Sequence, residues 1–332
     1  MKILLLTTGG TIASVLTDEG LAPSSDNDML RKIIKTVFSE YDITIKELFN
    51  LDSSNIQPEE WQLIARSIES HYQNYDGIVL THGTDTMAYT AGALSFMLHN
   101  IPIPIVLTGS QLPIHDPLTD GVDNLRCAFR MAISKQPGIF VAFNRKVILG
   151  TRAVKVKTTA FDAFESVNYP FIATVTAQGF ELKESFIPKP TGLFNFKPEI
   201  SDQVFLIKLT PGFSPKILHV LSNMHYRGIV IEAFGTGGLQ FIRRNLVDEL
   251  KTIVNMGISV VVCSQCLYEK SDFSLYQTGR KTKEAGVIEG YDMTTEAAVT
   301  KLMWALGQTD DPMKVRKIFN TCYFGETLKD YS

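Results

Sequence analysis

Short apolar runs of strand length alternate along the chain with longer stretches in which apolar residues recur every three or four positions. The first pattern predicts buried strands and the second predicts amphipathic helices. In the first half, the expected strands are 2–7, 43–49, 78–80, 104–108, 139–143 and 146–149, and the expected helices are 26–38, one opening at Pro58, one starting near Asp85, and 123–134. This order of strand, turn and helix is typical of a parallel, doubly wound sheet with flanking helices.

The same alternation resumes on a smaller scale after residue 203. The expected strands there are 204–209, 228–232 and 259–263, and the expected helices are 215–224, 243–256, 295–306 and 312–319. Between the two halves, residues 186–202 contain several prolines and no periodic pattern, as linkers do. We therefore predict an α/β fold with a larger N-terminal domain at 1–185 and a smaller C-terminal α/β domain at 203–332.

Polar side chains gather where four of the predicted strands end. These side chains are Thr11, Ser53, Thr84 with Asp85, and Ser110. Because the carboxyl ends of parallel strands share one edge of a sheet, and ligands bind beyond that edge, we expect a small-molecule site there. The stretch 15–28 follows the first of these turns and has little periodicity, so we expect a surface loop that closes over the site as a lid.

Known phosphate-binding loops do not fit the first of these turns. Residues 8–14 (TGGTIAS) contain adjacent glycines, but they lack both the Gly-x-Gly-x-x-Gly spacing of a dinucleotide site and the Gly-Lys-Ser/Thr of a P-loop. The backbone amides of this glycine turn could instead help to hold an oxyanion.

The residue types at the turns suit nucleophilic catalysis by threonine. A threonine hydroxyl needs a base, and a lysine oriented by a carboxylate can supply one. Thr84, Asp85 and either Lys155 or Lys157 could form such a relay, and the sequence alone does not choose between the lysines. His82 could also be a base, but a histidine that flanks a buried strand is more often a hydrogen-bonded part of the scaffold.

Composition restricts the class of protein. A chain of 332 residues suggests about two domains, and its 45% hydrophobic and 20% charged fractions are ordinary for a globular protein. A net charge of -3 offers no basic surface for nucleic acid, and no apolar run reaches membrane-spanning length. The four cysteines do not suggest a disulfide framework, and no secretory signal is visible, so we expect a cytoplasmic protein. The scattered histidines suggest no metal site.

Two stretches together resemble a known family. Residues 6–14 (LTTGGTIAS) and 77–87 (GIVLTHGTDTM) look like the two signatures of the bacterial-type L-asparaginases, the asparaginase/glutaminase family, and most resemble its cytoplasmic type I branch. The resemblance extends through nearly the whole chain, at 52–54, 108–111, 161–166, 285–288 and 300–307. It implies hydrolysis of L-asparagine to L-aspartate and ammonia through a threonine acyl-enzyme intermediate, with no cofactor and no metal.

The resemblance also assigns catalytic roles. It implies that Thr11 is the primary nucleophile and that Thr84, Asp85 and Lys155 form the family's Thr-Asp-Lys group, which decides between the two lysines. Family members also build their sites across an intimate dimer, so a homodimer or homotetramer is expected.

Substrate contacts follow from the same resemblance. Asp85 would bind the α-ammonium of L-asparagine, a charge-assisted pair. Ser53 would bind the α-carboxylate with Ser54 beside it, and the carbonyl of Ser110 would face the leaving amide.

The sequence departs from the family pattern at two places. Many members carry a lid tyrosine where this chain has Leu21; Tyr276 is a candidate replacement, although an ordinary packing tyrosine is the simpler interpretation. Some type I members bind an effector asparagine near the position of Cys266, together with a threonine and an arginine. The matching positions here are Val154 and Glu232, so both polar partners of the effector are missing and the resemblance does not carry allosteric control over to this chain.

Two alternatives to an asparaginase stay open. One is a related amidohydrolase that acts on glutamine or on an amide-bearing tRNA or peptide, which the net charge and the lack of an appended nucleic-acid module disfavour. The other is a catalytically silent amino-acid sensor, which the presence of both Thr11 and Thr84 disfavours. The spacing of Cys263 and Cys266 resembles a redox pair, but it lies at a predicted strand end and does not open a helix.

Overall fold

The computed structural model describes residues 1–17, 20–23 and 28–328. The chain divides into two units, Met1–Pro198 and Glu199–Ser332. The division falls inside the segment 186–202 that the sequence marks as a linker, while the boundaries at 185 and 203 stay predictions.

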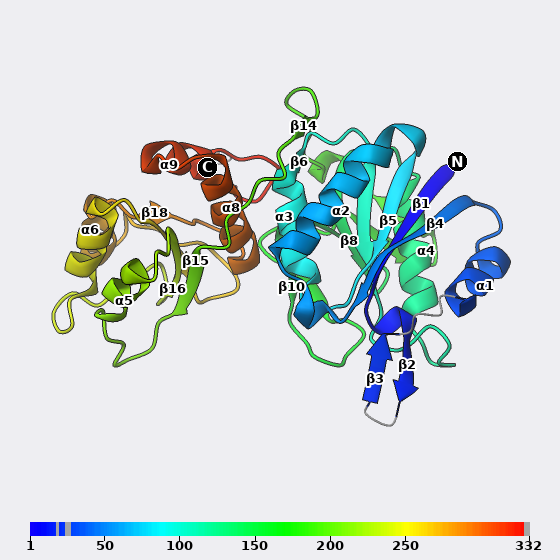
Figure 1. Cartoon of the computed structure of the whole chain (residues 1–332), viewed down its shortest axis with the longest axis horizontal. Helices are drawn as coiled ribbons and strands as arrows, with labels where there is room; N and C mark the ends of the chain where they lie inside the picture. The colour runs from blue at the N-terminus through cyan, green and yellow to red at the C-terminus, as the bar shows by residue number, and fades with distance from the viewer. Residues whose placement is uncertain (18–19, 24–27, 329–332) are drawn as a thin grey trace. The chain divides into compact units, whose positions relative to one another are not determined.

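A large mixed sheet forms the centre of the first unit (Figure 1). Its strand order is β13-β12-β9-β8-β7-β5-β1-β4. The strands are β1 (Lys2–Gly9), β4 (Asp42–Leu51), β5 (Gly77–Thr81), β7 (Pro104–Thr108), β8 (Gly138–Phe143), β9 (Lys146–Leu149), β12 (Ala173–Thr176) and β13 (Gly179–Leu182). The pairs from β4 to β8 are parallel, and β9, β12 and β13 extend the sheet in antiparallel fashion.

Counted in chain order, the parallel strands β1, β4, β5, β7 and β8 are arranged as 2-1-3-4-5. In this arrangement the direction of winding reverses between the first and third strands, here β1 and β5. Ligands of open α/β sheets bind at such a switch point, beyond the carboxyl ends of the strands. Thr11 follows β1 and Thr84 follows β5, so both candidate threonines lie at the switch point.

Helices flank this sheet, which explains why its central strands β5, β7 and β8 are buried along their whole length. The helices are α1 (Asp28–Val37), α2 (Pro58–His71), α3 (Met87–Met97) and α4 (Gly121–Ala132). Helix α2 begins at Pro58 with two glutamates in its first turn, as the sequence predicts. Helix α3 is buried on almost all sides, and the ring of Phe38, just after α1, packs edge-on against Phe129 of α4.

The region after β1 differs from the predicted irregular loop. Strands β2 (Ser14–Thr17) and β3 (Gly20–Pro23) pair in antiparallel register and project from the sheet as a hairpin (Figure 1). The expected helix caps at 26 and 27 lie outside the described residues. Smaller elements complete the unit: β6 (Leu98–His99) pairs with β14 (Asn195–Phe196), and β10 (Ala153–Lys155) pairs with β11 (Phe164–Ser166).

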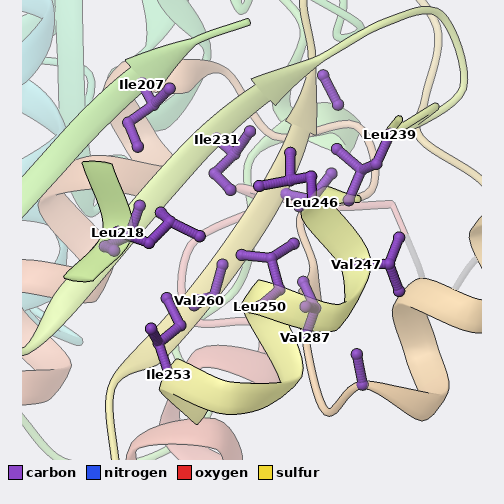
Figure 2. Close-up of a cluster of buried hydrophobic side chains, with 14 of the residues drawn as sticks. Ile207, Leu218, Ile231, Leu239, Leu246, Val247, Leu250, Ile253, Val260 and Val287 are labelled. Carbon is purple, nitrogen blue, oxygen red and sulfur yellow. The ribbon is translucent and has the colours of Figure 1, made fainter. Parts of the chain in front are cut away.

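The second unit is a smaller parallel sheet with helices around it, which confirms the predicted fold class. Its strands are β15 (Val204–Lys208), β16 (Gly228–Ala233), β17 (Ser259–Ser264) and β18 (Ile288–Glu289), and its helices are α5 (Ile217–Asn223), α6 (Leu246–Asn255), α7 (Gln277–Glu284), α8 (Thr295–Gln308) and α9 (Pro312–Asn320). Figure 2 shows how one side of α6 turns Leu246, Leu250 and Ile253 toward the strands that carry Ile231 and Val260. These positions recur at helical spacing, so the apolar stripe of α6 forms part of this core.

Within residues 1–17, 20–23 and 28–328, none of the helices combines the length and the apolar character that crossing a bilayer requires.

Candidate functional site

The ends of β1, β4, β5 and β7 meet through glycines that leave no room for a side chain. An ideal Cβ on Gly10 would lie 2.5 Å from the backbone nitrogen of Gly83. A Cβ on Gly83 would lie 2.6 Å from Oγ of Ser53, and one on Gly109 would lie 2.3 Å from the carbonyl oxygen of His82. These close approaches bring the four polar turns together at one edge of the sheet, as the sequence predicts.

Three of the candidate catalytic side chains are in direct contact. The Nζ of Lys155 lies 2.7 Å from Oγ1 of Thr84 and 2.5 Å from Oδ1 of Asp85. Thr84 is buried, the Lys155 side chain is 16% exposed, and the Asp85 side chain is 62% exposed. The partly buried Nζ of Lys155 therefore connects a buried hydroxyl to the Asp85 side chain, which faces solvent.

The structure distinguishes the two lysines that the residue pattern leaves open. Lys157 forms an ion pair with Asp162, and both side chains are exposed. Lys155, at the end of β10, is the lysine that reaches Thr84. Side chains on a strand alternate between its two faces, so residues two apart, such as Lys155 and Lys157, share a face as long as the strand continues. Because β10 ends at Lys155, Lys157 is not held on that face.

Ser53 is tied directly to the turn after β5. Its Oγ accepts a hydrogen bond from the backbone amide of Asp85 at 3.3 Å, and its carbonyl accepts one from the hydroxyl of Thr86 at 2.7 Å. Ser54 behaves differently, because both its amide and its hydroxyl donate to the carboxylate of Asp52, which caps the short helix there. In this structure the acceptor of the Asp85 amide is therefore the Ser53 hydroxyl.

These bonds also explain where the predicted helix begins. The sequence places its start near Asp85, and α3 begins at Met87 with Thr86 as its N-cap. The Asp85 amide and the Thr86 hydroxyl both bond to Ser53, and residues 84–86 form a turn before the helix begins.

The turn after β7 is held by Asp120, an acidic residue outside the predicted set of site residues. The carboxylate of Asp120 accepts hydrogen bonds from the amides of Gln111 and Leu112 and from the side chain of Asn124. The buried Ser110 hydroxyl donates to the carbonyl of Leu112. An aspartate immediately before a helix is the signal that could have identified this contact, since such residues bond to nearby amides.

Gln111 connects this turn to the segment that follows Lys155. Its side-chain Nε2 donates to the carbonyl oxygens of Thr158 and Ala160, at 3.2 and 3.0 Å. Gln111 lies within the family-like stretch 108–111, and nothing in the sequence around it predicts a contact with residues almost 50 positions away.

Thr11 opens a single helical turn, Thr11–Ala13, and its side chain is half-buried. The turn is fixed by its backbone: the amide of Gly10 donates to the carbonyl of Leu51, and the carbonyl of Ile12 accepts from the amide of Ile114. The Gly10 amide therefore already has an acceptor, which argues against it as an oxyanion donor.

His82 is a fully buried part of the scaffold, as the sequence suggests. Its Nδ1 lies 2.7 Å from the carbonyl oxygen of Gly83, and its Nε2 lies 2.9 Å from the hydroxyl of Thr90. Burial lowers the pKa of His82 to about 4, partly offset by the bond to Gly83. The imidazole is therefore neutral near neutral pH, and both of its nitrogens are engaged.

Replacing Gly10 by alanine should separate the turns that carry Thr11 and Thr84. Gly10 has a φ of +82°, and the added Cβ would collide with the backbone of Gly83. We expect a loss of stability of about 2–4 kcal/mol, measured by denaturant unfolding, from the left-handed backbone and the overpacking together. We also expect kcat for the amide hydrolysis that the family resemblance implies to fall about 100-fold, because a displacement of catalytic groups by roughly 1 Å has such an effect.

Gly179→Ala is the matched control for this substitution. Gly179 also has a left-handed φ, +113°, but no atom lies within 4 Å of its ideal Cβ. This variant should lose stability from backbone strain alone and keep wild-type kcat. If Gly10→Ala keeps wild-type kcat as well, the close approach of the two turns is not needed for activity.

The cysteines provide no redox pair or disulfide in this structure. All four are free thiols. Burial raises the pKa of Cys263 to about 12, with Glu232 and Glu296 adding to the shift, and Cys263 lies within β17 while Cys266 is exposed beyond its end. Among the residues described, no group of three or more His, Cys, Asp or Glu side chains is placed to hold a metal ion.

Comparison with protein families matches both units. The model described as "Asparaginase, N-terminal" matches residues 2–187, and the model described as "Glutaminase/Asparaginase C-terminal domain" matches residues 203–319. The chain belongs to the asparaginase family.

Similar proteins span almost the whole chain. An L-asparaginase from Thermococcus kodakarensis is 45% identical over 98% of this chain and 99% of its own length. The solved structure of L-asparaginase I from Vibrio cholerae is 33% identical, covers 98% of each chain and has a TM-score of 0.89. A glutamyl-tRNA(Gln) amidotransferase subunit from Pyrococcus furiosus is 37% identical over 98% of this chain but only 76% of its own length.

Two departures from the asparaginase pattern can be located. Leu21 lies in β3, but its side chain is outside the described part of the structure. Tyr276 is 64% exposed at the start of α7, so the simpler interpretation of a packing tyrosine is wrong within this chain. Glu232, at one position of the second departure, accepts a hydrogen bond from Thr295 and lies 3.5 Å from the Lys208 ammonium.

Proposed function

We propose that this protein hydrolyses the side-chain amide of L-asparagine to give L-aspartate and ammonia. The observation that carries the proposal is the contact of Lys155 with Thr84 and Asp85 beside the Thr11 turn, in a member of the asparaginase family. Relatives that match along their full length are named L-asparaginases, which favours this activity over that of the longer amidotransferase subunits.

In the first half of the reaction, Oγ1 of Thr11 attacks the amide carbon of the substrate. The hydroxyl proton is transferred to the leaving nitrogen, the C–N bond breaks, and ammonia departs. The product is an aspartyl ester on Thr11.

In the second half, water attacks the ester carbonyl. Lys155 in its neutral form, acting through the Thr84 hydroxyl 2.7 Å away, takes the proton from the water. The ester bond breaks, Thr11 regains a proton, and L-aspartate leaves. The same relay can serve the first half by accepting the Thr11 proton and passing it to the leaving group.

Substrate binding uses the turns around this relay. The exposed carboxylate of Asp85 pairs with the α-ammonium, and the buried Ser53 hydroxyl binds the α-carboxylate, with Ser54 alongside. The carbonyl of Ser110 faces the leaving amide. In this proposal no cofactor or metal takes part.

We also propose that the protein is cytoplasmic and forms a homodimer or homotetramer. Four free cysteines suit a reducing compartment, which supports the first point. The exposed Tyr276 suits a surface that a second copy covers, which supports the second.

Ammonia release from L-asparagine tests the proposed activity, with L-glutamine assayed in parallel. We expect turnover by the wild type and a loss of at least about 1,000-fold in Thr11→Ala, with Thr11→Ser retaining more activity because it keeps a hydroxyl. A folded wild type that binds L-asparagine and releases no ammonia from either amide would identify an amino-acid sensor.

A further inference from the structure

A chain of side-chain hydrogen bonds ends on the turn that carries Thr84. The indole Nε1 of Trp61, in α2, lies 3.0 Å from the hydroxyl of Thr90, in α3. That hydroxyl lies 2.9 Å from Nε2 of His82, and Nδ1 of His82 lies 2.7 Å from the carbonyl oxygen of Gly83. Trp61, Thr90 and His82 are all buried.

The chemistry of these groups fixes the direction of every bond. An indole nitrogen can only donate and a carbonyl oxygen can only accept, so Trp61 donates to Thr90 and Nδ1–H of His82 donates to Gly83. The imidazole is neutral, since burial lowers its pKa to about 4, and its Nε2 therefore accepts from the Thr90 hydroxyl. Each group has a partner, and the histidine is held as a single tautomer.

The Gly83 carbonyl lies at the start of the turn that carries Thr84. It belongs to the peptide that leads into Thr84, whose hydroxyl contacts Lys155. The backbone of His82 is itself fixed, because its amide donates to the carbonyl of Thr108 on β7 and Gly109 packs against its carbonyl. The Nδ1–H bond then sets the orientation of the next peptide.

We propose that His82 is a positioning residue that orients the Gly83–Thr84 peptide, and with it the Thr84 hydroxyl, toward Lys155. The imidazole touches no reacting atom and acts through the carbonyl of Gly83. Thr90 and Trp61 hold the imidazole in the tautomer that donates from Nδ1. This inference rests on the proposed amide hydrolysis.

The arrangement predicts that kcat depends on His82 more than KM does. Asp85, which would bind the substrate ammonium, is held separately by the Ser53 hydroxyl at its amide and by Lys155 at its carboxylate. Misorientation of the Gly83 carbonyl should therefore displace Thr84 while it leaves Asp85 largely in place.

The test compares three replacements of His82. His82→Leu removes both hydrogen bonds of the imidazole. In His82→Gln the amide nitrogen is one bond further from the backbone than Nδ1 is. In His82→Asn the amide nitrogen is bonded to Cγ, as Nδ1 is in histidine, so a donor stands at nearly the same place. We expect kcat for L-asparagine to fall about 10- to 100-fold in the first two, with KM within about 3-fold, and kcat to recover to within about 5-fold of wild type in His82→Asn. Rates are normalised to the folded fraction by near-ultraviolet circular dichroism, well below each unfolding midpoint.

Thr90 provides a second pair of variants in case His82 replacements fold poorly. Thr90→Val keeps the shape of the side chain and removes the hydroxyl, and Thr90→Ser keeps the hydroxyl. We expect a fall in kcat of about 3- to 10-fold for valine and wild-type kcat for serine.

The outcomes separate this inference from the proposed function. If the wild type releases no ammonia, the proposed function itself fails. If the wild type is active and His82→Leu and Thr90→Val keep wild-type kcat per folded molecule, His82 only stabilises the fold and the positioning role is wrong. Equal losses in His82→Asn and His82→Leu would also overturn it, because the donor at the Nδ1 position would then have no part in catalysis.

Discussion

Replacing Lys155 by methionine is expected to lower kcat for L-asparagine by about 1,000-fold or more. The substitution removes the nitrogen that lies 2.7 Å from the Thr84 hydroxyl, so the relay loses its base, and general base catalysis contributes about 10²–10⁴. Methionine preserves most of the aliphatic stem, which keeps the packing of β10. The measurement is ammonia release at saturating L-asparagine.

Lys157→Met is the matched control, made two residues further along the same segment. Lys157 pairs with Asp162 at the surface and has no contact with Thr84 in the structure described for residues 28–328. Its replacement should leave kcat within about 2-fold, since exposed ion pairs contribute little. Comparable losses in both variants would mean that positive charge in this segment matters and that the contact with Thr84 does not.

The largest effect on stability is expected from Glu326→Leu in the second unit. Lys301, in α8, and Glu326 form an ion pair at 2.6 Å with no exposed surface on either side chain. Lys301 also donates to the carbonyl of Thr321, and Glu326 accepts from the amides of Tyr323 and Phe324, so the pair fixes the chain after α9. Removal of the carboxylate leaves a buried ammonium without its counter-charge, for which we expect a loss of about 3–5 kcal/mol in unfolding free energy.

The double variant Lys301→Met/Glu326→Leu is the control for this prediction. It removes both charges together, and we expect it to recover most of the stability that Glu326→Leu loses. Additive losses would mean that the two residues stabilise the fold through packing and not through their charges.

The same pair predicts a pH dependence. Burial would raise the pKa of Glu326, but the Lys301 ammonium and the backbone amides more than offset it, so its pKa lies below the usual value. The pair therefore contributes fully above a pH of about 4.3, the ordinary value for glutamate, and its contribution is lost as the pH falls through the lowered pKa. Denaturant unfolding between neutral and acidic pH should show a steeper loss for the wild type than for the double variant.

The pattern of apolar residues in the sequence is sufficient to predict the buried strands at the centre of the large sheet. The strands β1, β5 and β7 each contain an unbroken apolar run because helices cover the sheet, so the sequence alone predicts that they are buried strands and gives their order along the chain. The polar residues at their ends follow directly, since parallel strands place their carboxyl ends at one edge.

Contacts between residues far apart in the sequence could not be predicted from it. Thr90 interrupts an apolar helix, which was a visible signal, but its partners Trp61 and His82 are brought to it only by the packing of α2 on α3. The pairing of β2 with β3 is not predictable from the sequence either, because these short strands show no long alternation of apolar and polar residues. The residue pattern does not decide whether Lys155 or Lys157 contacts Thr84, because that depends on where β10 ends.

Trapping of the acyl-enzyme tests the central claim most directly. Wild-type protein is mixed with L-asparagine, quenched in acid within the first turnover, digested, and analysed by mass spectrometry. We predict an added aspartyl group on the peptide that contains Thr11, absent from Thr11→Ala and accumulated in Lys155→Met if the second half of the reaction is the slower one. An aspartyl group on the peptide that contains Thr84, or ammonia release by a folded Thr11→Ala at the wild-type rate, would contradict the assignment of Thr11 as the nucleophile.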